Sequence, residues 1–492
     1  MTEGLSKYID EYFNVHVQGK TLGQGGQGIV FRTSVPDIAV KLATDNSGNP
    51  INNKQCYEQN KQKLKHVQNI PVAGCNIALP VALLKDYAGY VMQLLSDMQP
   101  FGNFWADGKS LHDIQDEDIP QWLSQCPKDT AKNIAYYCKT GGLLRRLIAL
   151  QNAATNLARL HNNGLVYGDV SPNNVFISSN ENYSEVWFID ADNLQFQKES
   201  ENGVYTPKFG APELVQGKAG SSFRTDCHAF ATMAFYMLSM LHPFIGKKVD
   251  GADSDWANTE PNSDFADLDT QAYAGLFPWI DDENDDCNSN EGGFPRMLVL
   301  TDALKRICQR TFGEARTNFW KRPTMLQWAE VFADAVDRVV QCPACKMSWY
   351  YDVQGDICPF CNHPKPTMLI FESFQYNGKG KPVTKRNVFA KEINKEQIDI
   401  PLHIFTSFSL SQSNINGLSV NNEKEEFTFK ISGNVDLSIA LSDKSNGRFK
   451  YLQKNIPYVL EKKTLLNEIW LRADNTAIPR LIRCTIKEEN NR

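Results

Sequence analysis

The chain has no run of apolar residues long enough to cross a bilayer, and it does not open with a basic segment followed by an apolar core. A membrane-spanning helix needs about 20 mainly apolar residues in a row. A secretory signal needs both a basic segment and an apolar core near the N-terminus. We therefore expect a cytoplasmic protein that makes no membrane contact.

An excess of positive charge is also missing. The 492 residues carry a formal net charge of -6, and 42% of them are hydrophobic while 22% are charged. Proteins that bind nucleic acid over much of their surface are usually basic, so we expect no nucleic-acid partner. The length and composition predict a soluble chain of about three domains.

The cysteines do not follow the pattern of a secreted disulfide framework, because eight of the twelve are scattered singly. The other four form two Cys-x-x-Cys pairs, Cys342 with Cys345 and Cys358 with Cys361. Four thiolates complete the tetrahedral shell of a structural Zn²⁺ ion and leave no open position for catalysis. The sequence therefore predicts a zinc ribbon over residues 341–365, with a redox-active pair as the alternative.

Near the middle of the chain, Asp169 and Asn174 lie five residues apart and precede the apolar, strand-like segment 175–177. The carboxylate could accept a proton from a hydroxyl group, and the amide oxygen could bind Mg²⁺ held by nucleotide phosphates. Asp and Asn beside Pro172 also suit an ordinary turn. Other motifs, in a fixed order along the chain, decide between these alternatives.

Upstream, Gly23, Gly25 and Gly28 form a glycine-rich turn that leads into the β-branched segment 29–31. Glycines let the backbone lie close to phosphates, but a dinucleotide-binding loop requires a helix at this point. The following strand therefore disfavours a Rossmann fold.

The next apolar segment, 38–42, contains Lys41. A lysine is costly to bury without a partner, so we expect it to meet phosphates and a carboxylate, for which Glu58 is best placed. Downstream, the strand-like segment 185–189 runs into Asp190, where oxygen ligands suit Mg²⁺ or Mn²⁺. A strand that ends in a turn is the simpler alternative for this last segment.

In this order, the motifs between about residue 15 and about residue 335 resemble those of the eukaryotic-like protein kinase superfamily. The resemblance implies a bilobal α+β kinase domain over residues 1–340, with an N-lobe of about 15–95 and a C-lobe of about 96–340. It implies that ATP is bound between the lobes and that the γ-phosphate passes to a hydroxyl group.

The resemblance also assigns roles to single residues. Asp169 is similar to the catalytic aspartate, Lys41 to the lysine that pairs with phosphates and with Glu58, and Asn174 and Asp190 to the metal ligands. The residues implied to bind the nucleotide come from the glycine-rich turn, the strand of Lys41, Glu58 and the hinge. They are Gly23, Gly25, Gly28, Val30, Ala39, Lys41, Glu58, Met92, Gln93 and Leu94.

Two further resemblances concern the helical lobe. Glu213, in Ala211-Pro212-Glu213, resembles the glutamate that pairs with a late arginine, here Arg322. Asp226 resembles the aspartate that supports the catalytic loop from beneath.

Three departures from the kinase pattern fall inside the predicted active site. Tyr167-Gly168 replaces the usual His-Arg, so we expect activity without phosphorylation of the loop. Ser171 replaces a lysine that steadies the transferred phosphoryl group. Asp190-Ala191-Asp192 keeps the metal ligand but lacks the Phe-Gly that follows it in the family. These losses support a pseudokinase scaffold as the alternative to an enzyme. We expect Tyr205 and Thr206 to be residues of the active-site lip, with phosphorylation sites as the alternative.

Apolar residues recur in steps of four and three from Leu143 to Leu157, which predicts a helix that ends near His161 with Gly164 as its C-cap. At a helix end, His161 is expected to interact with the terminal carbonyls. The acidic segment 250–291, which contains Trp256 and Trp279, predicts a solvated insertion.

Beyond Pro366, alternating apolar residues predict strands at 427–431 and 435–441 joined by a tight turn. Further candidate strands at 369–374, 469–471 and 481–486 predict an all-β sandwich or barrel over residues 366–492. No clear phosphate-binding motif is present in it. A partner-docking module and a rigid accessory domain both remain open.

A kinase followed by such a ribbon resembles bacterial kinases found with tellurite-resistance-type stress genes. In that setting the partners are a metal-dependent protein phosphatase and a von Willebrand A-like protein. The sequence therefore predicts a bacterial, ATP- and Mg²⁺-dependent serine/threonine protein kinase of stress or signalling, with a protein as substrate. A kinase that acts on a small molecule would share the same core.

Overall fold

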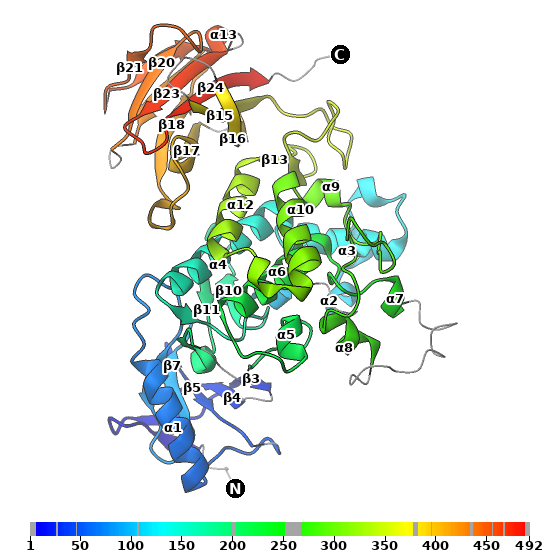
Figure 1. Cartoon of the computed structure of the whole chain (residues 1–492), viewed down its shortest axis with the longest axis vertical. Helices are drawn as coiled ribbons and strands as arrows, with labels where there is room; N and C mark the ends of the chain where they lie inside the picture. The colour runs from blue at the N-terminus through cyan, green and yellow to red at the C-terminus, as the bar shows by residue number, and fades with distance from the viewer. Residues whose placement is uncertain are drawn as a thin grey trace.

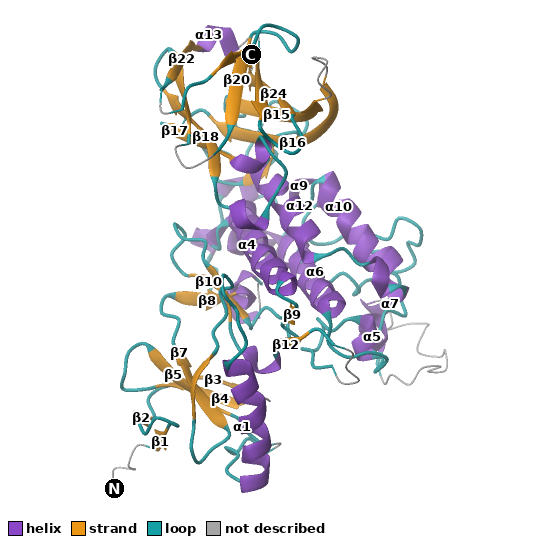
Figure 2. Ribbon diagram, turned by 60° about the vertical axis from the view of Figure 1, so that its left-hand side comes forward, coloured by secondary structure: helices purple, strands orange, loops and turns teal. Residues whose placement is uncertain are grey.

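The computed structural model describes residues 6–25, 28–45, 47–105, 108–198, 203–250, 267–376, 382–394, 396–432, 436–454, 456–465 and 468–487. Along the chain, a small sheet with one long helix is followed by a mainly helical body, a short cysteine-bearing hairpin and a β-rich end (Figures 1 and 2). This order confirms the predicted fold class. None of the described helices is long and apolar enough to cross a membrane.

The N-terminal lobe is built on a five-stranded antiparallel sheet in the order β3-β4-β5-β7-β6. Helix α1 (Lys54–Gln68) lies against it, and Leu64 of this helix packs on Leu83 and Tyr90 of the sheet. A separate hairpin of β1 and β2 precedes the sheet. The strands are β1 (Lys7–Ile9), β2 (Val15–Val17), β3 (Thr21–Gly25), β4 (Gly28–Arg32), β5 (Ile38–Leu42), β6 (Pro80–Leu83) and β7 (Gly89–Gln93).

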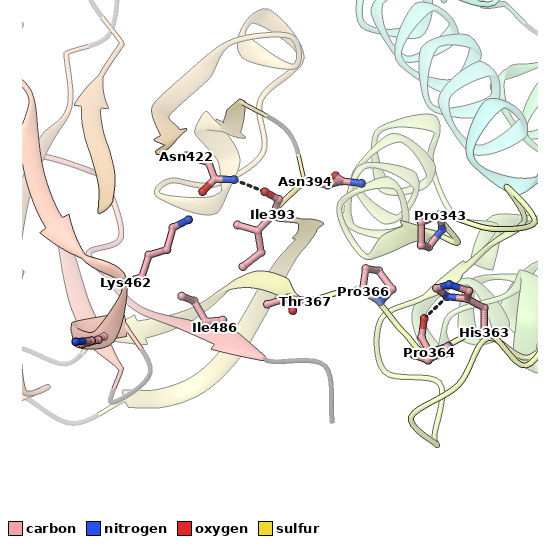
Figure 3. A pocket seen from close by; sticks show the side chains of 11 residues that line it. Pro343, His363, Pro364, Pro366, Thr367, Ile393, Asn394, Asn422, Lys462 and Ile486 are labelled. Carbon is pink, nitrogen blue, oxygen red and sulfur yellow. Dashed lines mark hydrogen bonds between the residues drawn. The ribbon is translucent and has the colours of Figure 1, made fainter. Parts of the chain in front are cut away.

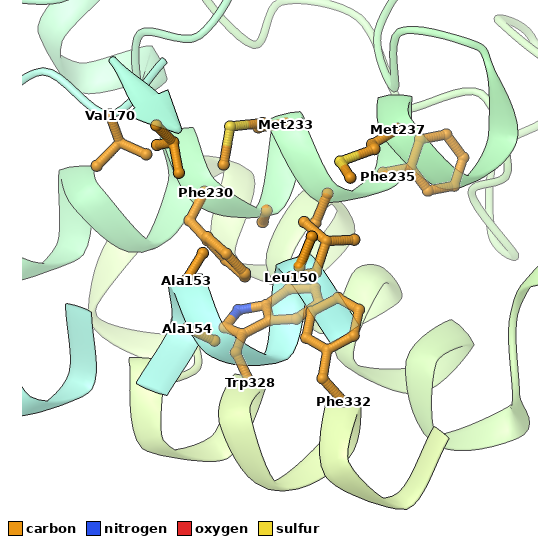
Figure 4. Close-up of a cluster of buried hydrophobic side chains, with 14 of the residues drawn as sticks. Leu150, Ala153, Ala154, Val170, Phe230, Met233, Phe235, Met237, Trp328 and Phe332 are labelled. Carbon is orange, nitrogen blue, oxygen red and sulfur yellow. The ribbon is translucent and has the colours of Figure 1, made fainter. Parts of the chain in front are cut away.

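Three long helices form the centre of the C-terminal lobe, and their apolar faces meet around Leu150, Phe230 and Trp328 (Figure 4). They are α4 (Gly142–Asn162), α6 (Phe223–Ser239) and α12 (Met325–Asp337). The shorter helices of this lobe are α2 (Gly108–His112), α3 (Lys128–Lys139), α5 (Pro212–Val215), α7 (Lys247–Asp250), α8 (Leu268–Tyr273), α9 (Arg296–Val299), α10 (Asp302–Cys308) and α11 (Ala315–Thr317).

Helix α4 confirms the predicted apolar periodicity, and Gly164 follows its end with a φ of 77°. Few residues except glycine adopt this left-handed conformation, which suits a residue that closes a helix. The role expected of His161 was wrong. Its Nε2 lies 3.1 Å from Oδ2 of Asp226 in α6 and not on the carbonyls at the end of α4. A buried carboxylate needs donors, and His161 is close enough to supply one.

Two small sheets carry the predicted catalytic loop between the lobes. One has the strand order β11-β10-β8, and the other pairs β12 with β9. Their strands are β8 (Met98–Pro100), β9 (Leu165–Val166), β10 (Val175–Ser178), β11 (Val186–Phe188) and β12 (Gln195–Phe196). The loop that holds Asp169 and Asn174 therefore begins and ends in strands, which fixes both of its ends.

The acidic segment after residue 250 is not a solvated insertion throughout. Trp279 is only 3% exposed, and its ring centroid lies 5.6 Å from that of Phe235 and 5.5 Å from that of Phe312. The acidic composition did not reveal the burial of Trp279, because a single buried aromatic residue is enough to hold a polar segment against the core. Trp256 lies outside the described residues.

The cysteine-bearing hairpin lies between the helical lobe and the β-rich end and packs on both. It contains β13 (Val339–Gln341) and β14 (Ser348–Tyr350). Tyr350 is buried in the core of the helical lobe, and its hydroxyl donates a hydrogen bond to Val299 O at 2.9 Å. Trp349, on the opposite side of the strand, is buried with Met368 and Val388 of the β-rich end. Adjacent side chains of one strand thus enter two different cores.

The β-rich end is a sandwich of two sheets, in the orders β16-β15-β24-β23-β20-β21 and β17-β18-β19-β22, around one apolar core. This confirms the predicted all-β region. Its elements are β15 (Met368–Tyr376), β16 (Pro382–Glu392), β17 (Gln397–Pro401), β18 (Asn416–Asn422), β19 (Glu426–Ile431), β20 (Ser438–Ser442), β21 (Lys450–Tyr451), β22 (Tyr458–Glu461), α13 (Lys462–Leu465), β23 (Ile469–Asp474) and β24 (Arg480–Lys487).

The hairpin predicted between 427–431 and 435–441 was wrong, although both strands exist. Strand β19 belongs to the four-stranded sheet and β20 to the six-stranded sheet, so the chain crosses from one layer to the other between them. Gly433 and Asn434 of the predicted turn lie outside the described residues.

We predict that Arg322→Ala destabilises the helical lobe by about 3–5 kcal/mol, because Glu213 would remain as an unpaired buried charge. Arg322 donates two hydrogen bonds to Glu213, from Nη1 to Oε1 at 2.7 Å and from Nη2 to Oε2 at 3.1 Å, and both side chains are buried. Urea unfolding followed by circular dichroism measures the loss. Lys321→Ala is the control, because its pair with Glu314 is exposed and should contribute less than about 1 kcal/mol.

His403 of the sandwich and Asp337 of α12 form a buried pair, with 2.6 Å between Nε2 and Oδ2. Burial lowers the pKa of His403, but the charge of Asp337 raises this pKa more, and Asp334 and Glu330 add to the increase, so the net shift is upward. A raised pKa means that the folded state binds the proton more tightly than the unfolded state.

We therefore predict that this pair stabilises the protein fully below about pH 6.5, the ordinary histidine value, and less as the pH rises through the higher folded-state pKa. The free energy of unfolding of the wild type minus that of His403→Gln should shrink from pH 6 to pH 9. The same subtraction with His112→Gln, which changes an exposed histidine, should stay flat. A constant difference for His403→Gln would contradict the prediction.

Candidate active site

The loop that carries Asp169 is held from below by Asp226, which lies in the first turn of α6 and is buried. Oδ2 of Asp226 accepts a hydrogen bond from Tyr167 N at 2.8 Å, and Oδ1 accepts one from Gly168 N at 2.9 Å. Gly168 has a φ of 89°, and a Cβ atom at this position would lie 3.1 Å from Asn193 O. The backbone conformation therefore explains why a glycine stands where the family has an arginine.

Asp169 is 5% exposed, and both of its carboxylate oxygens are engaged. Thr206 donates its hydroxyl hydrogen to Oδ1 at 2.7 Å, and Asn174 Nδ2 donates to Oδ2 at 3.1 Å. Burial raises the pKa of Asp169, although both hydrogen bonds oppose the increase. A carboxylate in this environment is oriented and is a better proton acceptor than one in water.

Thr206 was predicted as a lip residue, and the structure places its hydroxyl directly on the predicted catalytic carboxylate. The two residues are 37 positions apart in the sequence, and no periodicity or spacing links them. Tyr205, its neighbour, is exposed. Only the path of the segment between β12 and α5 brings the Thr206 hydroxyl to Asp169.

Lys41 lies in β5 and is buried, and its ammonium group pairs with two carboxylates. One is Asp190, and the other is Asp192, with 2.7 Å between Nζ and Oδ2. The predicted pairing of Lys41 with Glu58 is not what the structure has, because Glu58 is exposed on α1. Spacing along a helix does not reveal which side faces the sheet, and Glu58 falls on the outer side.

This group of charges is not balanced. Burial raises the pKa of Asp190 to about 6, Lys41 opposes the increase and the charge of Asp192 adds to it. Burial lowers the pKa of Lys41, but Asp192 and Asp190 raise it more, so the ammonium group stays charged. One ammonium group cannot neutralise two carboxylates, and a divalent cation bound here would remove the remaining repulsion.

The donor set suits a hard cation. Asp190 offers carboxylate oxygens and Asn174 offers an amide oxygen, which are the ligands that Mg²⁺ and Mn²⁺ prefer. Ile189 N donates a hydrogen bond to Asn174 O at 3.0 Å, so the residue before Asp190 is tied to the loop of Asn174. Asp190 has a φ of 59°, and this unusual conformation turns the chain sharply after β11.

The other predicted nucleotide-binding residues lie on the sheet and hinge around Lys41. Ala39 pairs with Met92 in the register of β5 and β7, and Lys41 pairs with Tyr90 in the same register. Val30 lies opposite Lys41 on β4. The Leu94 amide donates to Asp37 O at 2.9 Å and is therefore engaged within the lobe. An adenine base would have to use backbone groups beside Leu94, such as those of Gln93.

The three predicted phosphate-loop glycines differ in whether the surrounding structure leaves room for a side chain. A Cβ atom on Gly28 would lie 2.2 Å from Leu42 O, so the close approach of β4 to β5 excludes any other residue there. A Cβ atom on Gly23 would meet nothing within 4 Å. Gly25 ends β3 next to residues 26 and 27, which lie outside the described ranges.

The four paired cysteines form a second candidate site, in the hairpin. Their sulfur atoms all lie within 4.8 Å of one another, with 3.6 Å between Cys342 and Cys361 and 3.7 Å between Cys345 and Cys358. Zn–S bonds of about 2.3 Å in a tetrahedron place sulfur atoms about 3.8 Å apart, so this group has the size of a zinc shell.

The two cysteine knuckles also have matching backbones. Lys346 follows the first pair with a φ of 61°, and Asn362 follows the second pair with a φ of 60°. The amides of Cys345 and Phe360 point at the sulfur atoms of Cys342 and Cys358, at 3.5 Å and 3.4 Å. Amide donors of this kind stabilise a thiolate that binds a metal.

A cavity of about 570 Å³ lies beside this hairpin, between it and the sandwich (Figure 3). Pro343 and His363 line it from the hairpin, and Lys462, Ile393 and Ile486 line it from the sandwich. It contains none of the predicted active-site residues and lies at the opposite end of the helical lobe from Lys41.

Comparison with known proteins agrees with this geometry. The sequence model of the family described as "Protein kinase domain" matches residues 146–272, which include Asp169, Asn174, Asp190 and Asp226. The chain is similar to serine/threonine-protein kinase pkn2 of Myxococcus xanthus, with 31% identity over 110 residues, which are 21% of this chain and 13% of the relative. It is also similar to serine/threonine-protein kinase mos of Gallus gallus, with 22% identity over 243 residues, which are 46% of this chain and 62% of the relative.

The chain thus spans less than two thirds of each of these relatives. The matched residues nevertheless include the buried Asp226, the loop that it supports and the acidic turn that holds Lys41. The bilobal fold and these matches make the chain similar to protein kinases of the eukaryotic-like type, with the family model covering residues 146–272.

Proposed function

We propose that the chain is an ATP-dependent protein kinase that transfers the γ-phosphate of MgATP to serine or threonine hydroxyls of a protein substrate. One observation carries the proposal: Lys41 of β5, the loop of Asp169 and Asn174, and Asp190 after β11 converge between the two lobes. Both relatives are serine/threonine-protein kinases by name, which supports the hydroxyl preference.

In this proposal each side chain has one task. Lys41 holds the nucleotide phosphates, and Asp169 orients the substrate hydroxyl and accepts its proton. The hydroxyl oxygen bonds to the γ-phosphorus as the bond from that phosphorus to the bridging oxygen breaks and ADP leaves. Asn174 and Asp190 would hold Mg²⁺ or Mn²⁺, which when bound neutralises charge on the phosphates. Thr206 fixes the carboxylate of Asp169, so the proton acceptor does not have to be ordered during the reaction.

Ser171 limits the expected rate. It is buried beside Asp169 in the position where the resemblance implies a lysine, so it brings no positive charge to the transferred phosphoryl group. This deficit favours the alternative function, a scaffold that binds nucleotide and partners without efficient transfer. A kinase that phosphorylates a small molecule would use the same residues and differ only in its substrate surface.

The cellular setting is part of the proposal. We propose a cytoplasmic kinase of bacterial stress or signalling, with domains over 1–340, 341–365 and 366–492. A metal-dependent protein phosphatase and a von Willebrand A-like protein are the proposed partners. The support for these partners is the resemblance described above.

For the four cysteines we propose a structural Zn²⁺ ion. The sulfur spacing and the matching knuckles support it, and Cys342 and Cys358 are buried, which suits a site without an open position. The ion would hold together the hairpin that packs on both the helical lobe and the sandwich.

We predict that Asp169→Ala and Lys41→Ala each abolish most phosphate transfer. Loss of the proton acceptor should lower kcat by about 10²–10⁴-fold, and loss of the phosphate-binding cation should lower kcat/KM by at least about 10²-fold. Transfer from labelled ATP to a general protein substrate or to the chain itself, with Mg²⁺, is the measurement.

Asp116→Ala is the matched control, because this aspartate is 73% exposed and its partner Lys128 is exposed too. Its activity should equal that of the wild type. Wild-type protein that binds ATP without transferring phosphate would establish the scaffold instead. Transfer to metabolites but not to peptides would establish the small-molecule kinase.

We predict one zinc ion per chain, measured by elemental analysis of the purified protein. Cys358→Ser should lose the ion and lower the thermal midpoint, because the metal links two turns of a hairpin whose small core is shared with the sandwich. Cys126→Ser, which changes a single half-buried cysteine, should keep both. A metal-free wild type with a reversible disulfide between the knuckles would favour the redox alternative.

A further inference from the structure

Helix α1 has no carboxylate on the side that faces the sheet. Its one acidic residue, Glu58, is exposed. Tyr57, Leu64 and Val67 are buried and mark the inward side, and Asn60 lies among them at helical spacing. The Oδ1 atom of Asn60 is buried and has no hydrogen-bond partner among the residues that the structure describes. The inward side of the helix therefore carries a carboxamide and no carboxylate, and a carboxamide cannot balance the charge of a buried lysine.

We propose that Asp192 holds Lys41 in position for the nucleotide phosphates, in place of a carboxylate from helix α1. The inference rests on the proposed kinase function and assigns a positioning residue within the same site. Nζ of Lys41 and Oδ2 of Asp192 are 2.7 Å apart, with the two side chains 6% and 20% exposed. At this depth, the contact is shielded from water and is stronger than a surface pair.

The turn after β11 makes the contact possible. Asp190 takes a left-handed conformation, and residues Ala191–Asn193 follow as a short 3-10 turn. Ala191 is fully buried, so the turn is anchored on the lobe beneath it. Asp190 and Asp192 consequently point at the same ammonium group although one residue separates them.

A bound metal ion explains why Lys41 needs two carboxylate partners. Asp190 is a proposed metal ligand, and a carboxylate that binds a divalent cation attracts an ammonium group less strongly. Asp192 then keeps Lys41 in place while Asp190 serves the metal. Without Asp192, the buried lysine would share its carboxylate with the ion.

Helix α1 still contacts this turn, but the helix supplies a lysine donor where a carboxylate acceptor was expected. Lys63 of the helix donates from Nζ to Oδ1 of Asn193 at 3.1 Å. The helix therefore contributes a cation and the turn contributes the acceptor. This contact is exposed and should add little stability, and it does not involve Lys41.

The test is a double-mutant cycle on the full chain with Asp192→Asn, Lys41→Met and the two combined, and with Glu58→Gln as the matched control. We expect Asp192→Asn to lower kcat/KM for ATP by about 10- to 100-fold, and Lys41→Met to lower it at least as much. The combined variant should be no worse than Lys41→Met alone, because both changes break the same contact. Glu58→Gln should stay within about twofold of the wild type.

Additive losses, normal kinetics in Asp192→Asn, or a loss in Glu58→Gln as large as that in Lys41→Met would each overturn the inference. Recovery of Asp192→Asn at high Mg²⁺ would also overturn it, because Asp192 would then serve the metal.

The affinity for MgATP, measured by calorimetry on the same proteins, distinguishes a failure of the proposed kinase function from a failure of the role proposed for Asp192. If the wild type binds MgATP but transfers no phosphate, the kinase proposal fails, while the cycle in binding affinity still decides the role of Asp192. A wild type that binds no MgATP overturns both.

Discussion

The charge balance around Lys41 constrains the whole active site. A lysine buried in the N-terminal sheet meets two carboxylates from the turn after β11, so the two lobes are joined by a pair of ionic contacts. Two buried tyrosines, Tyr90 and Tyr167, border the same group, and burial together with the neighbouring carboxylates raises the pKa of each. Negative charge therefore exceeds positive charge here, which a protein tolerates at a site that binds cations.

The loop that carries Asp169 is ordered by contacts that do not depend on a phosphorylated residue. Asp226 accepts two backbone amides of the loop, and Thr206 and Asn174 donate to the two oxygens of Asp169. The family uses an arginine before the aspartate to receive a phosphate, and this chain has Gly168, whose backbone fits closely against Asn193. The same aspartate is thus oriented by buried hydrogen bonds, which are available without a modification.

The cysteine hairpin determines how the helical lobe and the sandwich are connected. Alternate side chains of β14 enter the core of the lobe and a second core shared with the sandwich, so the hairpin is a structural element of both. The His403–Asp337 pair and the hydrogen bond from Arg159 to Leu410 O add direct contacts between sandwich and lobe. A metal ion in the hairpin would therefore stabilise the connection between these units as well as the hairpin itself.

The sequence by itself determined the order of the kinase motifs, the paired cysteines, helix α4 and five strands of the sandwich, because each depends on residues close together in the chain. Tertiary structure decided the partner of Lys41, the contact of Thr206 with Asp169, the burial of Trp279 and the separation of β19 from β20. Each of these depends on which side of an element faces its neighbour, or on segments far apart in the chain. Residue spacing and composition do not reveal these contacts, because several arrangements satisfy the same local preferences and only the packing of the whole chain selects one of them.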